Sequence, residues 1–232
     1  MTDNTITITV ADGTFNAYVA QPASMPAPAV IVIQEIYGVN AVMRGVADRL
    51  AEAGFLAVAP DLFWRIEPGI DLTDQTDAGN ARAFELFGLY DVDAGVGDIA
   101  ATIDQVRDLP ECTGKVGAVG YCLGGKLAFL TATRTDSDAS VGYYAVGLDA
   151  LVGEAEKLAH PLMLHVAEED RFVPKTSQTI VEQGLSNHPQ VVLHAYPGRD
   201  HAFARLGGMH YDAADAALAD RRTLEFLNAN LK

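Results

Sequence analysis

The chain has 232 residues, 49% of them hydrophobic, and a formal net charge of −15. A chain of this length can bury roughly 70–75% of the surface that it exposes when unfolded, so it needs neither a metal ion nor disulfide bonds to hold a core together. The strong negative charge repels phosphate backbones and anionic lipid surfaces, which excludes nucleic-acid binding and membrane binding from the expected functions.

Hydrophobic periodicity predicts strands and helices along the chain. Residues 6–10 and 15–20 alternate on either side of Asp12-Gly13, which predicts an antiparallel hairpin. The β-branched run at residues 30–33 is typical of a strand buried on both faces. The same reasoning predicts strands at 55–59, 115–119, 141–146, 161–166 and 191–196, and helices at 40–53, 77–89, 91–109, 123–133, 177–185 and 211–230. Residues 61–76 show little periodicity and are expected to form a surface excursion that covers a pocket.

Strands that alternate with helices predict an α/β fold with a mostly parallel central sheet, flanked by helices and preceded by the antiparallel hairpin. Open sheets of this kind often exceed 200 residues without dividing, and no linker, repeat or low-complexity tract interrupts the pattern. We therefore expect a single α/β domain over residues 1–232.

The segment at residues 116–126 predicts a nucleophile elbow, the sharp turn between a strand and a helix that exposes a reactive side chain. A strand enters, Gly120-Tyr121-Cys122-Leu123-Gly124 makes the turn, and an apolar helix leaves. Side chains in place of the two glycines would collide with the neighbouring strand and helix. The turn also places Cys122 at a helix N-terminus, whose partial positive charge favours a thiolate and a developing oxyanion.

Two other interpretations of this segment are weaker. Most cysteines of this kind are inert and buried, but the strand–turn–helix context favours a reactive thiol at Cys122. Residues 120–126 also match the phosphate-loop pattern G-x-x-x-x-G-K, yet Leu127 stands where the magnesium-binding Ser or Thr is required. Cys112, between Pro110 and Gly114, is interpreted as a structural residue of a connecting loop.

The acid and the base of such a site follow the nucleophile in that order, on loops after later strands. Asp170 follows the strand at 161–166 and His201 follows the strand at 191–196, so both are expected at the carboxyl edge of the sheet. Asp170 lies far enough past its strand for the loop to turn back toward the histidine. The sequence therefore predicts a triad of Cys122, His201 and Asp170 in a single α/β-hydrolase domain.

Other acids and histidines are less well placed for these roles. Asp200 is a poor orienter of its neighbour His201 because consecutive side chains diverge, and Glu168 and Glu169 lie closer to the strand end than Asp170. His165 and His194 lie inside predicted strands, where we expect them to be packed. The remaining histidines occupy loop or strand-entry positions, namely His160, His188 and His210.

Several segments spread over nearly the whole chain match one known family. They are 34–38 (Gln-Glu-Ile-Tyr-Gly), 120–125 (Gly-Tyr-Cys-Leu-Gly-Gly) and 201–205 (His-Ala-Phe-Ala-Arg), together with Asp170 and shorter matches at 61–62, 94–98 and 142–144. Through these segments the chain resembles the dienelactone hydrolase (carboxymethylenebutenolidase) family. It implies opening of the enol-lactone of dienelactone to maleylacetate through an acyl-enzyme, during the degradation of aromatic compounds. The implied substrate is a small anionic lactone or ester.

The resemblance also implies roles for residues outside the triad. Glu35 would accept a hydrogen bond from a neutral resting thiol and help to deprotonate it when substrate binds. The backbone N–H groups of Leu123 and Ile36 would form the oxyanion hole. Arg205 would bind the substrate carboxylate, a role that suits the fork of a guanidinium.

Two positions depart from the family pattern. At the position where the family has a second arginine that binds the substrate carboxylate, this sequence has Asn80. Arg82 is two residues further on, and on a helix its side chain would point about 200° away from that of Asn80. The serine that follows the family's histidine is Ala202. Arg82 and Tyr144 are nevertheless kept as expected substrate-binding residues. Phe84 and Phe87 either line the pocket or pack in the core.

Three rival functions remain open at this point. A thiol carboxylesterase or lactonase of the same fold would keep the chemistry and change the substrate, which the Asn80 departure favours. A redox-sensing relic would use Cys122 as a switch without catalysis. A serine hydrolase is the third, but Ser177 and Ser186 do not lie in an elbow.

The cysteine content and the N-terminal residues indicate a reducing compartment. Two cysteines are too few for the disulfide framework of a secreted protein. Residues 1–6 lack the basic region and apolar run of a signal peptide, and no stretch reaches the ~18–20 apolar residues that a membrane span needs. We expect a cytoplasmic monomer that uses no metal ion and no cofactor.

Overall fold

The computed structural model describes residues 4–232 and divides the chain into two compact units, Met1–Ala118 and Val119–Lys232. The predicted single domain over the whole chain stays a prediction, and residues 1–3, on which the signal-peptide argument partly rested, lie outside the described residues. None of the helices within 4–232 has the length and apolar character that a membrane crossing requires.

The strands of the first unit confirm the predicted hairpin. Their order is β1-β2-β4-β3, with bounds β1 (Thr5–Val10), β2 (Gly13–Ala20), β3 (Ala27–Ile33) and β4 (Leu56–Pro60). The β1/β2 pair is antiparallel, and so is the β2/β4 pair, whereas β3 and β4 are parallel. Every residue of β3 and β4 is buried, as expected for apolar strands covered on both faces.

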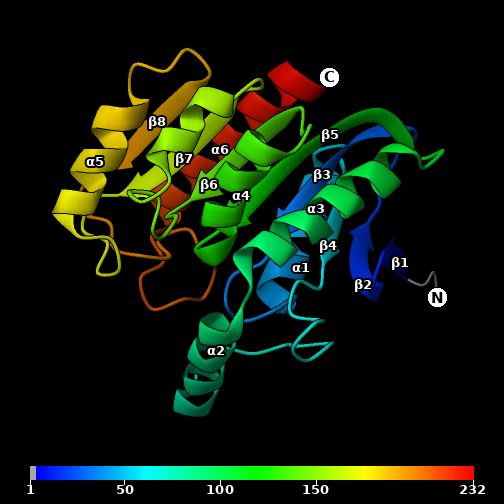
Figure 1. The fold of residues 1–232 in the computed structure, drawn as a ribbon, viewed down its shortest axis with the longest axis horizontal. Coiled ribbons are helices and arrows are strands. Elements are labelled where there is room, and N and C mark those ends of the chain that lie inside the picture. Colours follow the sequence, from blue (N-terminus) through cyan, green and yellow to red (C-terminus); the bar gives the residue numbers. More distant parts are fainter. Residues whose placement is uncertain (1–3) are drawn as a thin grey trace. The chain divides into compact units, whose positions relative to one another are not determined.

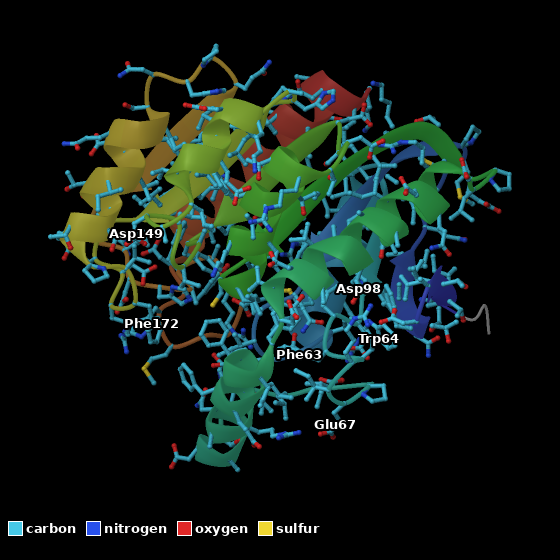
Figure 2. All side chains as sticks on the ribbon, viewed as in Figure 1. Phe63, Trp64, Glu67, Asp98, Asp149 and Phe172 are labelled. Carbon is cyan, nitrogen blue, oxygen red and sulfur yellow. The ribbon has the colours of Figure 1, made fainter. Side chains whose placement is uncertain are left out.

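Three helices of the first unit begin at side-chain caps. They are α1 (Ala41–Glu52), α2 (Asp77–Leu89) and α3 (Val92–Arg107), and the cap side chains of Asn40, Thr76 and Asp91 accept hydrogen bonds from N–H groups of the first turn. Between β4 and α2 the chain forms the predicted irregular excursion, which is tied to α3. Trp64 donates to Asp98 at 2.8 Å, and Arg65 also binds this buried carboxylate. Figure 2 shows Trp64 and Asp98 side by side.

The second unit has a parallel arrangement of strands with helices on two faces. After β5 (Cys112–Tyr121), which runs across the division between the units, it contains α4 (Leu123–Arg134), β6 (Ala139–Tyr143), the 3-10 helix η1 (Val152–Lys157), β7 (Leu162–Ala167), α5 (Lys175–Leu185), β8 (Val191–Tyr196) and α6 (Ala213–Leu231). The strands β6, β7 and β8 pair in parallel. In Figure 1, α4 and α5 lie in front of these strands and α6 lies behind them.

A buried polar network joins these strands to α6. The ring of His165 contacts the Tyr196 hydroxyl at 2.8 Å and the Thr223 hydroxyl at 3.0 Å, and Thr223 also contacts the Tyr143 hydroxyl at 2.6 Å. Burial, followed by the nearby His194 and Arg222, holds the pKa of His165 well below its usual range. His165 is therefore a neutral packed residue, which confirms the prediction for this histidine.

Two local expectations were wrong, and one short helix was missed. Cys112 is the first residue of β5 and does not lie in a loop before it, because β5 begins three residues earlier than the apolar run indicated. The strand predicted at 141–146 ends at Tyr143, since Tyr144 adopts a left-handed φ of 37° that breaks the extended backbone. The helix η1 was not predicted.

Candidate active site

The turn between β5 and α4 holds Cys122 in an unusual backbone conformation. Its φ and ψ are 59° and −114°, a region that costs energy for any residue with a side chain. The Cys122 N–H donates to the Tyr143 carbonyl at 3.0 Å, and the Lys126 N–H donates to the Cys122 carbonyl at 3.2 Å. These bonds anchor the turn to β6 on one side and to the first turn of α4 on the other.

Glycines allow the turn to be this tight. A Cβ at Gly120 would lie 1.9 Å from the Gly124 oxygen and 2.4 Å from the Gly124 carbonyl carbon. A Cβ at Gly125 would lie 2.6 Å from the Tyr143 oxygen, so α4 approaches β6 closely at this point. The prediction that Gly120 has no room for a side chain is confirmed, and Gly125 adds a second close approach.

His201 and Asp170 meet at the ends of neighbouring parallel strands. The His201 Nδ1 lies 2.8 Å from the Asp170 Oδ2, and their residues are only 7% and 6% exposed. The other oxygen of Asp170 accepts the Phe172 N–H at 2.9 Å, which fixes the carboxylate. The pairing arises because β7 and β8 are adjacent, so the loops that follow them emerge at the same edge.

Two aromatic rings contact the imidazole of His201. The edge-to-face contact from Tyr144 has a centroid distance of 5.1 Å, and that from Phe172 has a distance of 4.9 Å. Tyr144 is buried, whereas Phe172 is 51% exposed and lies on the surface loop where Figure 2 labels it. Tyr144 also lines a cavity of about 520 Å³ between β6–β8 and α5. This ring therefore touches both the cavity and the histidine.

The side chain of Cys122 hydrogen bonds His201 and changes its pKa. Burial lowers the pKa of His201, but the charge of Cys122 and the hydrogen bonds from Asp170 and Cys122 outweigh burial and raise it to about 10. The imidazole of His201 is therefore in hydrogen-bond contact with both the thiol and the carboxylate. The structure brings the three predicted residues together within the second unit.

Left-handed backbone marks the same place. Cys122, Tyr144 and Ala202, with φ of 59°, 37° and 63°, are the residues other than glycine with positive φ in the part of the chain that is described. Two of them touch His201 and the third follows it directly in the chain. Such strain gathers at functional sites, so the backbone alone points to this region. Sequence reasoning missed Tyr144 in this respect because nothing in its neighbours signals a left-handed turn.

The side chain of Asp200, which the sequence analysis considered as an orienter of the His201 ring, pairs with Arg171. Its Oδ1 accepts the N–H groups of Arg171 and His201, and its Oδ2 accepts Nε and Nη2 of Arg171 at 2.9 and 2.5 Å. Burial raises the pKa of Asp200, but these hydrogen bonds and the Arg171 charge hold it well below its usual range. Arg171 Nη2 also lies 2.5 Å from the His210 Nε2. The rejected acid Glu169 pairs instead with Lys175 at the surface.

Arg205 lies on the loop that follows His201 and is only 4% exposed. Its N–H donates to the Ala202 carbonyl at 3.0 Å and its carbonyl accepts the Gly208 N–H, so the loop is compact around it. Burial lowers the pKa of Arg205 to about 10, which still leaves the guanidinium charged at neutral pH. The second unit thus contains a buried cation close in sequence to His201.

The remaining predicted residues lie in the first unit. Glu35 and Ile36 follow β3 and are buried, at 2% and 6% exposure. Gln34 holds their loop by accepting the Leu62 N–H at 3.0 Å. Both residues with a predicted catalytic role therefore lie in a packed segment at the end of β3. The predicted roles are those of the Ile36 N–H as an oxyanion donor and of the Glu35 carboxylate as the acceptor of the thiol hydrogen. Leu123, the other predicted oxyanion donor, is the first residue of α4 in the second unit.

Helix α2 carries Arg82, Phe84 and Phe87, three of the residues that were expected to bind substrate. Arg82 pairs with Glu85 at 2.7 Å and with Glu67 at 2.5 Å, so two carboxylates already neutralise it. Phe84 and Phe87 are 50% and 39% exposed, which excludes the interpretation that they pack in the core.

Asn80, the departure from the family pattern, is also on α2. Its Oδ1 accepts the Tyr37 hydroxyl at 2.7 Å, and its Nδ2 donates to the Asp74 carbonyl. Asn80 therefore holds the loop after β3 against the start of α2. Within residues 4–232 no group of three or more His, Cys, Asp or Glu side chains is arranged to hold a metal ion.

A thiol on a strained strand–helix turn, with a histidine and a carboxylate on loops after later parallel strands, defines an α/β-hydrolase. The family model described as "Dienelactone hydrolase family" matches residues 15–231. The chain therefore belongs to the dienelactone hydrolase family, and so to the carboxylic ester hydrolases.

Individual relatives agree with this membership. The chain is 43% identical over 223 residues to the carboxymethylenebutenolidase of Pseudomonas putida, covering 96% of this chain and 94% of that one. It is 39% identical over 215 residues to carboxymethylenebutenolidase 1 of Cupriavidus pinatubonensis, covering 93% and 92%. A crystal structure from Klebsiella pneumoniae that is named for dienelactone hydrolase superposes with a TM-score of 0.85 at 25% identity, covering 97% of each chain. These matches confirm the predicted fold class.

Proposed function

We propose that this chain hydrolyses dienelactone, 4-carboxymethylenebut-2-en-4-olide, to maleylacetate, and that Cys122 forms an acyl-enzyme during the reaction. The observation that carries the proposal is the contact of His201 with both Cys122 and Asp170 on one sheet edge. The identity of 43% to the Pseudomonas putida carboxymethylenebutenolidase supports this substrate.

The first step uses the charge distribution of the site. Cys122 and Asp170 raise the pKa of His201 to about 10, which makes the imidazole a strong enough base to take the thiol proton. The thiolate is the nucleophilic form of cysteine, and it lies at the N-terminus of α4, where the helix dipole favours negative charge.

The thiolate attacks the lactone carbonyl carbon, and the ring C–O bond breaks. The charge that develops on the carbonyl oxygen is stabilised by the backbone N–H of Leu123, whose position after the nucleophile is the usual one for this role. The N–H of Ile36 is the second donor in this proposal. The leaving enolate takes the proton of His201, so the imidazole becomes neutral as the thioester forms.

Acylation changes His201 from an acid into a base. Once the sulfur is part of a thioester, the Cys122 charge and hydrogen bond that raise the pKa of His201 are gone, while burial continues to lower it. A neutral imidazole held by Asp170 then takes a proton from water, and the resulting hydroxide attacks the thioester. The thiolate leaves and the starting state is restored.

Arg205 is the residue that we expect to bind the carboxylate of the substrate. It is buried, charged at neutral pH and placed on the loop after His201. A protein of net charge −15 needs such a local cation to hold an anion. Glu35 would accept the thiol hydrogen whenever the proton returns to sulfur, as the resemblance implies. Tyr144, Phe84 and Phe87 would contact the apolar part of the substrate.

A thiol carboxylesterase with a different substrate is the second candidate, and one observation favours it. The arginine that could replace the missing family residue, Arg82, is already paired with Glu67 and Glu85, and Asn80 at the family position carries no charge. A site with one cation binds a carboxylate less tightly than a site with two. This candidate predicts that neutral esters are good substrates.

The free thiols of Cys112 and Cys122 suit a reducing environment, so we propose a cytoplasmic enzyme. We also propose that residues 1–232 act as one domain and as a monomer.

Hydrolysis of dienelactone by the purified protein, followed by chromatography of substrate and maleylacetate, tests the function. We expect turnover by the wild type, none by Cys122→Ala, and normal turnover by the matched control Cys112→Ala. Mass spectrometry of the quenched reaction should find the acyl group on the peptide that contains Cys122. Retained turnover in Cys122→Ala would refute the thiol mechanism. Faster turnover of neutral p-nitrophenyl acetate than of dienelactone would favour the second candidate.

A further inference from the structure

The two loops that carry Asp170 and His201 are joined by a second contact besides the one between those two side chains. Arg171 is the next residue after Asp170, and Asp200 is the residue before His201. Their side chains meet through Nε and Nη2 of Arg171 and the Oδ2 of Asp200, at 2.9 and 2.5 Å. The backbone N–H of Arg171 also donates to the Oδ1 of Asp200 at 3.0 Å.

Asp200 links the two loops in both directions. The same Oδ1 that accepts the Arg171 N–H also accepts the His201 N–H at 2.6 Å. One carboxylate therefore fixes the backbone on either side of the His201–Asp170 hydrogen bond. Because the carboxylate accepts several charge-assisted and backbone hydrogen bonds, it is more strongly held than an ordinary surface ion pair.

The contact extends to the loop that carries Arg205. The Nη2 of Arg171 lies 2.5 Å from the Nε2 of His210, five residues beyond Arg205. The three segments that hold the acid, the base and the buried cation of the second unit are thus joined at Arg171. The side chain of Arg171 is 48% exposed and that of Asp200 is 22% exposed, so this junction lies at the protein surface.

We propose that Asp200 and Arg171 are positioning residues, which hold the Asp170 loop against the His201 loop and thereby keep the imidazole aligned with Cys122. Neither residue contacts the reacting atoms in this proposal. A displacement of about 1 Å in a reacting group is enough to cost about 100-fold in rate. The role is distinct from that of Asp170, which contacts the ring itself. The inference rests on the proposed function of Cys122 and His201.

Single and double substitutions test the proposal. We expect Asp200→Asn and Arg171→Gln each to lower kcat by about 10- to 100-fold with a smaller change in KM, because alignment rather than binding is lost. The loss in the double variant should be clearly smaller than the product of the two single losses, since both substitutions remove the contact between Arg171 and Asp200. Arg171→Lys should not restore kcat, because an ammonium lacks the fork that reaches Asp200.

Glu169→Gln is the matched control. It removes one negative charge from the same loop, next to Asp170, but its partner Lys175 faces solvent and both side chains are 60% exposed. We expect its kcat to stay within about twofold of the wild type. The proposal is overturned if Asp200→Asn loses no more activity than this control, if the two single losses multiply, or if Arg171→Lys is fully active.

Alkylation of Cys122 by iodoacetamide separates this inference from the proposed function. The rate is measured for each cysteine peptide by mass spectrometry, with Cys112 as the internal reference, and needs no substrate. We expect Cys122 to react several-fold more slowly in Asp200→Asn than in the wild type, and equally fast in Glu169→Gln. If the wild type hydrolyses no lactone but shows this pattern, the proposed function fails and the positioning role stands. If Cys122 reacts equally in all variants, the positioning role fails.

Discussion

Substitution of Gly120 by alanine is expected to damage the active site by moving the start of α4. The Cβ of an alanine would lie 1.9 Å from the Gly124 oxygen and 2.4 Å from its carbonyl carbon. Ordinary contacts begin at roughly 3.4 Å, so the helix start or the strand end has to shift by about 1–1.5 Å. Both neighbours are backbone and cannot turn aside as a side chain would.

This shift predicts two measurable losses. Overpacking of this kind costs about 1–3 kcal/mol of unfolding free energy. Displacement of Cys122 and the Leu123 N–H by about 1 Å is expected to lower kcat by about 100-fold or more. The assay is dienelactone hydrolysis together with urea unfolding followed by circular dichroism.

Gly97→Ala is the control for this substitution. Gly97 lies inside α3, and a Cβ there would meet nothing within 4 Å. Alanine in a helix interior is favoured over glycine, so we expect an unchanged kcat and a gain of about 0.5–1 kcal/mol in stability. Normal activity and normal stability of Gly120→Ala would refute the steric argument for the elbow.

Three further predictions concern the residues around the elbow. Asp170→Asn should lower kcat by at least about 100-fold, because an amide donates to the His201 Nδ1 and enforces the wrong tautomer; activity near the wild-type level would contradict this role. The folded-state pKa of His201, about 10 against 6.5, means that its stabilising contribution is complete below pH 6.5 and is lost as the pH rises through 10. The difference in unfolding free energy between the wild type and His201→Gln, measured by urea titration, should therefore shrink over that range, and a difference that grows would be inconsistent. Arg205→Gln should raise KM for dienelactone but leave KM for p-nitrophenyl acetate unchanged, and equal effects on the two substrates would argue against a carboxylate-binding role.

The sequence was most informative where a local pattern has one structural solution. The alternation of strands and helices predicted the fold class, and the spacing of Gly120, Cys122 and Gly124 predicted the turn. The chain order of the hydrolase fold then led to Asp170 and His201, because loops after adjacent parallel strands emerge together. Each of these inferences depends on short-range pattern or on topology.

The features that sequence reasoning missed depend on contacts between distant residues. Asp170, and not Asp200, contacts the His201 ring, but the pairing of Asp200 with Arg171 joins two loops that no local pattern connects. The partners of Arg82, Glu67 and Glu85, likewise decide whether that arginine is available to an anion, and one of them is 15 residues away. The left-handed turn at Tyr144 depends on the packing after β6, where the sequence continues to look like a strand.

At the three residues with positive φ around His201, stability and activity favour different side chains. Glycine relieves such a conformation at Cys122 or Tyr144, but removes the nucleophile from the first and the ring beside the imidazole from the second. Selection for thermal stability alone would therefore favour glycine at these two positions, although the resulting variants would be inactive. At Ala202, with φ of 63°, the side chain that glycine removes is only a methyl group. Of these three substitutions, Ala202→Gly is therefore the one expected to stabilise the enzyme without loss of activity.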